Sequence, residues 1–156
     1  MNKMKKLYLI LLFLLSLTKA FGQTNFGPET FNLENGIALH GYDPVSYFHG
    51  VPAKGSSMKT EMHQGIKYLF DTSENLKNFK ENPQKYIPVY GGWCAYAMGA
   101  SGELVDVDPE TYKIIDGKLY LFYNAYFNNT LKKWNRNEEE LLQKANQNWD
   151  QLTKEY

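Results

Sequence analysis

The alternation of apolar and polar residues after position 58 predicts two β-hairpins. Each consists of two short segments around a two-residue turn: Lys59–His63 and Ile66–Phe70 around Gln64-Gly65, and Tyr112–Ile115 and Lys118–Tyr123 around Asp116-Gly117. A glycine in the turn is typical of this structure, because a two-residue hairpin turn needs positive φ angles that other residues adopt at a cost. Asp116-Gly117 is the stronger of the two signals.

A spacing of three to four residues between apolar positions predicts three helices. The first is capped by Thr72 or Ser73 and ends at Asn82-Pro83, because a residue before proline avoids the α region. The second covers Asn124–Trp134. The third is capped by Asn137, with Glu140 three residues on, and carries one apolar stripe: Leu141, Leu142, Ala145, Trp149 and Leu152. We therefore expect an α+β fold in which a small antiparallel sheet of two β-hairpins packs with three helices.

The first 22 residues have the order of regions that is typical of a secretory signal peptide. Three lysines precede an apolar run from Leu7 to Leu17, and the small residues Ala20 and Gly22 suit a cleavage site. The run is too short to cross a bilayer as a helix. We therefore expect an exported chain, periplasmic or secreted, with no stable membrane span after cleavage. Residues 23–36 are expected to form a flexible lead-in, and residues 37–156 a single domain.

Charge and aromatic content limit the classes of function. The full chain has 17 basic and 17 acidic residues, and loss of the four leader lysines leaves 13 against 17, a net charge of −4. Nucleic-acid binding is not expected, since it requires a basic face that neutralises phosphates. Of the 24 aromatic residues, 21 lie after the leader, which is enough for a core that does not depend on disulfides.

Five segments in order give the chain a resemblance to exported YHS domain-containing proteins. They are Gly41-Tyr42-Asp43-Pro44-Val45-Ser46-Tyr47-Phe48, Tyr68-Leu69-Phe70 with Asn75 and Phe79, Asn82-Pro83-Gln84-Lys85-Tyr86, Tyr90-Gly91-Gly92-Trp93-Cys94-Ala95, and Asp116-Gly117-Lys118-Leu119-Tyr120-Leu121. The resemblance covers roughly residues 37 to 150. It implies a small α+β domain with a treble-clef-like core, related to modules found in metal-handling proteins. For the exported branch, it implies no biochemical activity.

The chain departs from the metal-binding form of that family at its cysteines. The metal-binding form has a Pro-Val-Cys-Gly opening, where this chain has Pro44-Val45-Ser46. The Tyr-Phe-Cys-Ser segment is replaced by Tyr68-Leu69-Phe70-Asp71-Thr72-Ser73, and Asn75 lies near the place of a third cysteine. Structural zinc takes about four ligands, mostly Cys and His. We therefore expect the zinc-type site of the family to be lost.

Cys94 is the only cysteine, and three hypotheses about it stay open. Cys94 and Met98 are four residues apart and could offer two sulfurs to Cu(I), or Cys94 could hold Zn²⁺, with His40 or His49 completing the site. Cys94 could equally be a buried small hydrophobe, with Gly91 and Gly92 allowing another element to come close. A reactive or intermolecular thiol is the third hypothesis. His63, beside a hairpin turn, is expected to be exposed.

No catalytic signature accompanies these residues, so we do not expect an enzyme. Asp106-Val107-Asp108-Pro109-Glu110 gathers three carboxylates that could bind a hard cation, but an acidic turn before the second hairpin is favoured. Two functional hypotheses follow. The first is an exported, non-catalytic YHS-type module that binds a transition metal, preferably copper. The second is a metal-free structural or interaction domain on the same scaffold, with an envelope protein as partner.

Overall fold

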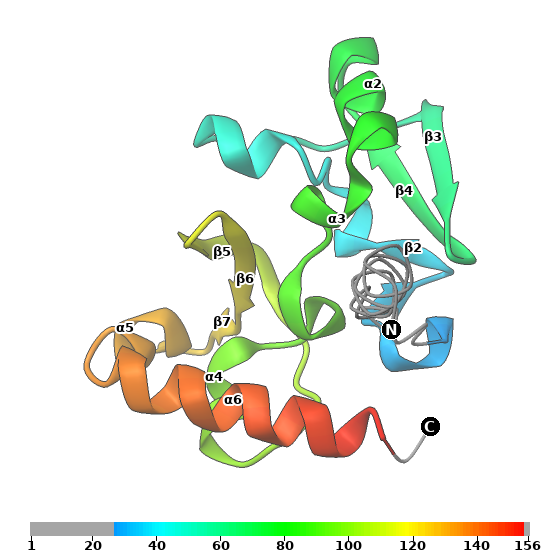
Figure 1. Cartoon of the computed structure of the whole chain (residues 1–156). Coiled ribbons are helices and arrows are strands. Elements are labelled where there is room, and N and C mark those ends of the chain that lie inside the picture. The colour runs from blue at the N-terminus through cyan, green and yellow to red at the C-terminus, as the bar shows by residue number, and fades with distance from the viewer. Residues whose placement is uncertain (1–26, 155–156) are drawn as a thin grey trace, which may run out of the picture.

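The computed structural model describes residues 27–154 (Figure 1). The expected leader and residues 23–26 lie outside this part of the chain. Within residues 27–154, none of the helices combines the length and apolar character that crossing a bilayer requires. The elements in order are η1 Pro28–Thr30, β1 Leu33–Glu34, β2 Ile37–Ala38, η2 Leu39–Gly41, η3 Ser46–His49, β3 Ser56–His63, β4 Ile66–Phe70, α2 Ser73–Glu81, α3 Pro83–Tyr86, η4 Val89–Gly92, α4 Ala95–Ala100, β5 Asp108–Ile115, β6 Lys118–Phe122, β7 Asn124–Ala125, β8 Asn128–Asn129, α5 Thr130–Trp134 and α6 Glu138–Leu152.

The strands confirm the mixed α+β class and both predicted hairpins, but the hairpins lie in separate sheets. The first sheet has the order β1-β2-β4-β3, and the second consists of β5 and β6 alone. The expectation of one sheet built from two hairpins is therefore wrong. The free edge of β4 is taken instead by β2, which pairs with it in parallel through Ile37 and Lys67. This partner comes from the segment before the first hairpin, and no local pattern specifies it.

Strand β6 divides the core of the molecule into two clusters of buried side chains. Leu119 and Leu121 face the cluster that contains β4 and α2, while Tyr120 and Phe122 face the cluster that contains α4, α5 and α6. Successive side chains of a strand point to opposite faces, so this one strand is buried on both sides. In Figure 1, β5 and β6 accordingly lie between α2 with β3 and β4 at the top and α4 with α6 at the bottom.

Two of the predicted helices form as expected and one does not. The Thr72 side chain accepts a hydrogen bond from the Asn75 backbone N–H, which caps α2 at the predicted place. The segment expected to be helical from Asn124 to Trp134 instead begins with the β7–β8 hairpin, so this prediction is wrong for residues 124–129. The physical reason is the side chain of Asn129, which accepts from the Lys132 N–H and so starts α5 only at Thr130.

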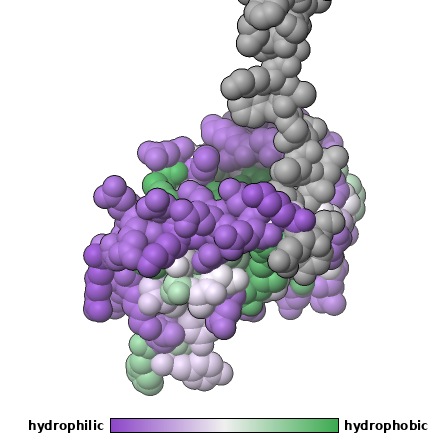
Figure 2. Space-filling view, turned by 60° about the horizontal axis from the view of Figure 1, so that its bottom comes forward, coloured by the Kyte–Doolittle hydropathy of each residue, from purple (hydrophilic) through white to green (hydrophobic). Residues whose placement is uncertain are grey.

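Helix α6 lies across the bottom of the molecule and packs closely on α4 (Figure 1). A Cβ atom added to Gly99 of α4 would lie 2.5 Å from the carbonyl oxygen of Leu141, so only glycine allows this approach. The predicted apolar stripe faces inward, with Ala145 fully buried. The Asn137 side chain makes no cap to the backbone and instead donates to the Glu140 carboxylate. The surface seen in Figure 2, where this helix comes forward, is mostly hydrophilic.

The lead-in expected to be flexible is packed against the domain from residue 27 onward. The Asn32 N–H donates to the carbonyl of Gly91 at 2.9 Å, and the Trp93 indole N–H donates to the carbonyl of Thr30 at 2.9 Å. Gly91 has a φ of +61°, and a Cβ there would lie 2.7 Å from the Thr30 carbonyl oxygen. The close approach predicted for Gly91 therefore occurs, and its partner is the lead-in itself.

Candidate functional site

Cys94 lies at the start of α4 and is completely buried. Its sulfur accepts a hydrogen bond from the Tyr123 N–H at 3.3 Å and lies 3.4 Å from the hydroxyl of Thr130. The Thr130 hydroxyl donates its single proton to the carbonyl of Tyr123 at 2.8 Å. The proton between sulfur and hydroxyl must therefore come from Cys94, so the thiol both donates and accepts in this arrangement.

These contacts place the thiol at the base of the β7–β8 hairpin. Tyr123 immediately precedes β7 and Thr130 immediately follows β8, and the Thr130 N–H donates to the Tyr123 carbonyl at 3.0 Å. Cys94 thus bonds to the residues on both sides of the hairpin and fixes them to the start of α4. The hypothesis of a buried small side chain is the one of the three that matches this environment.

Met98, the second sulfur of the hypothetical copper site, is also fully buried but packs elsewhere. Its side chain belongs to the cluster that contains Trp134 and Phe122, whereas Cys94 belongs to the cluster that contains Leu121. The two residues are joined through the backbone, by the hydrogen bond from the Met98 N–H to the Cys94 carbonyl at 3.0 Å. The helical spacing predicted from the sequence therefore exists, but the two sulfurs face different parts of the core.

His40 occupies the central position of a strained turn at the surface. Leu39, His40 and Gly41 have φ angles of 57°, 50° and 80°, three successive residues in the left-handed region. Such conformations cost free energy in residues other than glycine and are common at functional sites. The His40 Nε2 atom lies 2.9 Å from Oδ1 of Asp106, which fixes the imidazole ring.

Asp106 is itself held by two further donors. The Asn32 side-chain amide and the Val107 N–H both donate to Oδ1 at 2.8 Å. Partial burial acts to raise the pKa of Asp106, but the hydrogen bonds from Asn32 and Val107 and the interaction with His40 outweigh it. The pKa of Asp106 is therefore lowered from its ordinary value. A carboxylate that stays ionised keeps the imidazole oriented over a wide range of pH.

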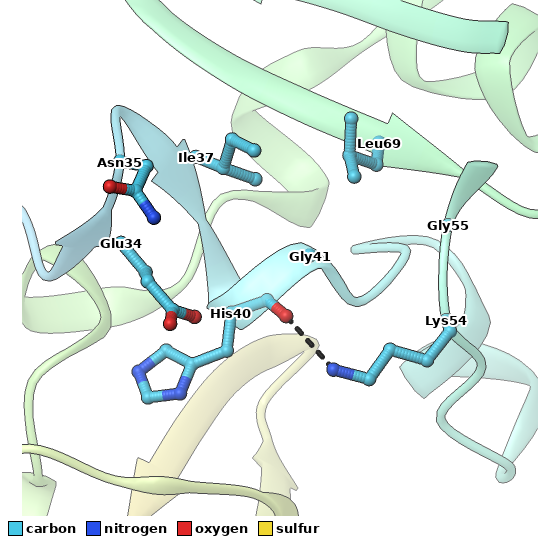
Figure 3. Close-up of a pocket in the computed structure, with 8 residues that line it drawn as sticks. All are labelled: Glu34, Asn35, Ile37, His40, Gly41, Lys54, Gly55 and Leu69. Atoms are coloured by element: carbon cyan, nitrogen blue, oxygen red, sulfur yellow. Dashed lines mark hydrogen bonds between the residues drawn. The ribbon is translucent and has the colours of Figure 1, made fainter. Parts of the chain in front are cut away.

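The His40 side chain lines an open pocket of about 340 Å³ (Figure 3). The lining residues are Glu34, Asn35, Ile37, His40, Gly41, Lys54, Gly55 and Leu69. The Lys54 ammonium donates to the carbonyl of His40 at 3.0 Å and lies 4.2 Å from the ring centroid of Tyr42. In the close-up, the carboxylate of Glu34 lies beside the imidazole, with Ile37 and Leu69 forming an apolar wall. This combination suits a small polar molecule, since a bare cation would share the pocket with the Lys54 ammonium.

The remaining histidines lie outside this pocket. His49 ends η3 and is exposed, and it does not line the pocket of His40. His63 is half-buried rather than fully exposed, with its ring nearly perpendicular to that of Phe79 at a centroid distance of 6.1 Å. Among residues 27–154, no group of three or more His, Cys, Asp or Glu side chains is arranged to hold a metal ion. The predicted ligands Cys94, Met98, His40 and His49 thus lie in different surroundings.

A third polar site surrounds Asp43, whose side chain is completely buried. Its Oδ1 accepts from the Val45 N–H at 2.8 Å, and its Oδ2 accepts from the Asp71 N–H at 2.9 Å and from the Asn75 amide at 2.7 Å. The hydroxyl of Ser46 donates to the Asp43 carbonyl at 2.6 Å. Asp43 therefore joins the turn before η3 to the end of β4 and the start of α2.

The sequence indicated parts of these sites but missed how they are assembled. Asp106 was predicted to be part of an acidic turn, and nothing in the local pattern paired it with a histidine 66 positions away. Asn32 belonged to the expected lead-in. The Asp43 side chain bonds within its own turn through the Val45 N–H, but nothing in the local pattern pointed to its two distant donors, Asp71 and Asn75. Comparisons with known protein families, curated proteins and solved structures give no match to this chain.

Proposed function

We propose that the protein is an exported, non-catalytic interaction domain that retains a YHS-type scaffold without a metal ion. The supporting observation is the hydrogen-bond network of Asp43. Ser46 stands where the family resemblance places the first lost cysteine, and Asn75 stands near the place of the third. Both bond to Asp43, Ser46 to its backbone carbonyl and Asn75 to its side-chain carboxylate, so the positions that would converge on a metal ion converge on one buried residue.

The Asp43 network can stabilise the segments around it in the way that a structural metal ion would, by joining them to one centre. A zinc site fixes segments that are distant in the chain by tying them to one centre. Asp43 likewise joins segments that are distant in the chain, because its side chain accepts hydrogen bonds from Val45, Asp71 and Asn75. Hydrogen bonds to an ionised acceptor are stronger than neutral ones, by about twofold. The scaffold therefore has an internal substitute for the metal ion, and its surface remains free for a partner.

A transition-metal module is the second hypothesis from the sequence, and the structure favours it less. The only thiol is fully buried and already uses its proton and its acceptor capacity within the protein. A metal would require the hairpin base to open and the thiol to lose its proton. His40 is engaged by Asp106 in a pocket that also holds a lysine.

Metal titration under anaerobic conditions distinguishes the two hypotheses. The reduced chain from Gln23 onward is titrated with Cu(I) and with Zn²⁺, and the titration is repeated on Cys94→Ser. We expect no binding tighter than micromolar for either ion, and the same unfolding midpoint with and without a chelator. Stoichiometric metal in the purified protein, or binding that Cys94→Ser abolishes, would show the metal-free proposal to be wrong. Native Cys94 should also react slowly with a thiol reagent and rapidly after denaturation.

A further inference from the structure

The β7–β8 hairpin ends in two aromatic side chains that are almost entirely in solvent. Tyr126 is 92% exposed and Phe127 is 112% exposed, meaning that the Phe127 side chain makes practically no contact with the rest of the domain. We call these two residues the aromatic tip. They are the two central residues of a two-residue turn, since Ala125 pairs with Asn128 directly before and after them.

The backbone of the aromatic tip is strained at a position where the other hairpin turns of residues 27–154 have glycine. Tyr126 and Phe127 have φ angles of 49° and 62°. The described part of the chain has three further two-residue hairpin turns, and each of them places glycine at the second position: Asn35-Gly36, Gln64-Gly65 and Asp116-Gly117. Positive φ is unfavourable for bulky residues. The needs of the turn itself therefore do not account for two aromatic residues at this place.

The base of the hairpin is rigid, so the aromatic tip is held in place. Cys94 bonds to residues on both sides of the hairpin, as described above. The Asn124 amide donates to Thr111 at 3.0 Å and to Asp108 at 3.3 Å on the neighbouring strand β5. Asn129 caps the following helix. Two apolar side chains on a fixed support, without contacts of their own, have the properties of an anchor for a binding partner.

We propose that the aromatic tip inserts into the interface of a lipid bilayer that contains anionic lipid. This inference rests on the interaction-domain function and names its partner. A protein partner typically covers about 800 Å² and 20 to 30 residues on each side, with an apolar centre. Here three of the four strand residues beside the tip are asparagines, Asn124, Asn128 and Asn129, and the fourth is the small residue Ala125. Phenylalanine and tyrosine side chains on a small projection suit the depth of a lipid interface.

The charges that follow the hairpin favour anionic lipid. Lys132 and Lys133 lie in the last turn of the short helix α5, and both are exposed. Each basic residue near an anionic surface contributes about 1 kcal/mol of attraction, which falls off within about 10 Å at moderate salt. The expected net charge of −4 is therefore less important than these two lysines, which follow Phe127 by five and six positions in the chain. Since two aromatic residues and two lysines are a modest anchor, we expect binding no tighter than about 10⁴ M⁻¹.

The variant Tyr126→Asn/Phe127→Gly tests the proposal without harming the fold. Asn-Gly is the preferred pair for this turn, so the double variant should unfold at a higher denaturant concentration than the unsubstituted protein. Its loss of lipid binding could then not be attributed to misfolding. Met58→Ser is the matched control, because Met58 is also 92% exposed but lies on β3. Lys132→Gln tests the role of charge.

The assay is co-sedimentation of the chain from Gln23 onward with vesicles at millimolar lipid. One vesicle population is pure phosphatidylcholine, and the other contains one quarter phosphatidylglycerol. We expect the unsubstituted protein and Met58→Ser to bind the anionic vesicles equally. The turn variant should bind at least tenfold more weakly, and Lys132→Gln about fivefold more weakly. In Phe127→Trp, fluorescence from position 127 should shift to shorter wavelength with anionic vesicles and be quenched by brominated lipid.

Three results would overturn the lipid proposal. The first is no binding of the unsubstituted protein to anionic vesicles. The second is equal binding by the turn variant, which would place the contact elsewhere. The third is capture of a protein partner through Tyr126 while vesicles remain unbound, which would mean that the aromatic tip serves protein recognition. Each of these leaves the metal-free interaction domain intact, because that proposal fails only if the protein binds metal.

Discussion

Replacing the buried carboxylate of Asp43 is the most direct test of the proposed metal-free scaffold. In Asp43→Asn the shape of the side chain is kept, but one of its two acceptor oxygens becomes an NH₂ group. Three donors converge on this side chain, from Val45, Asp71 and Asn75. In its best orientation the new oxygen faces the two donors of Asp71 and Asn75, which leaves the NH₂ group against the Val45 N–H.

The magnitude follows from the groups left without partners. One buried N–H and one buried NH₂ group would lack an acceptor, and each such group costs about 1–3 kcal/mol. Loss of the charge weakens the two remaining hydrogen bonds as well. We therefore expect Asp43→Asn to lower the free energy of unfolding by about 3 kcal/mol.

Urea unfolding followed by tryptophan fluorescence measures this change, since Trp134 is fully buried. Asp71→Asn is the matched control: the Asp71 backbone N–H belongs to the network, but its exposed side chain does not. The control should stay within about 0.5 kcal/mol of the unsubstituted protein. A similarly small effect for Asp43→Asn would mean that the network does not hold the region together. A gain in stability when Zn²⁺ is added to the unsubstituted protein would also contradict the proposal of a metal-free scaffold.

Three further predictions concern the hairpin base, the α4–α6 contact and the pH response. Cys94→Ala should lower the free energy of unfolding by about 2 kcal/mol in urea, because the Tyr123 N–H loses its acceptor and a small cavity is left. Gly99→Ala should cost about 1–3 kcal/mol in the same assay, because the added methyl group would overlap the Leu141 carbonyl. The lowered pKa of Asp106 means that its stabilising contribution is present above the ordinary value of 3.8 and is lost as pH falls through the folded-state pKa. The difference in unfolding midpoint between the unsubstituted protein and Asp106→Asn should therefore shrink on acidification below that pH.

These three predictions have distinct contradicting results. A Cys94→Ala variant as stable as the unsubstituted protein would mean that the sulfur contacts do not fix the hairpin. If Gly99→Ala left the free energy of unfolding unchanged, α4 and α6 could separate without cost. Ala100→Gly, at the exposed neighbouring position, is the comparison, and it should lower the free energy of unfolding by about 1 kcal/mol through helix propensity alone. If the difference in unfolding midpoint between Asp106→Asn and the unsubstituted protein grew at low pH, the expected loss of the stabilising contribution of Asp106 on acidification would be wrong.

The sequence by itself determined those features whose causes lie within a few residues. Asp116-Gly117 produced a hairpin because the turn needs positive φ at both positions, and the Thr72 hydroxyl started a helix by accepting from a nearby N–H. The α6 stripe followed from helical spacing. Where the local signal was ambiguous, around residues 124–129, the prediction of helix was wrong, because two aromatic residues gave no sign of a turn.

Only the tertiary structure decided which distant groups meet. Cys94 became a support for the hairpin because Tyr123 and Thr130 reach it from 29 and 36 positions away. His40 acquired its carboxylate from Asp106, and Asp43 acquired Asn75. The physical reason is that a polar group withdrawn from water must find a partner somewhere in the folded chain, but its residue type does not say which one. The two core clusters pack around β6, and this packing brings the distant polar groups into contact. It also leaves the aromatic tip at the surface, in solvent.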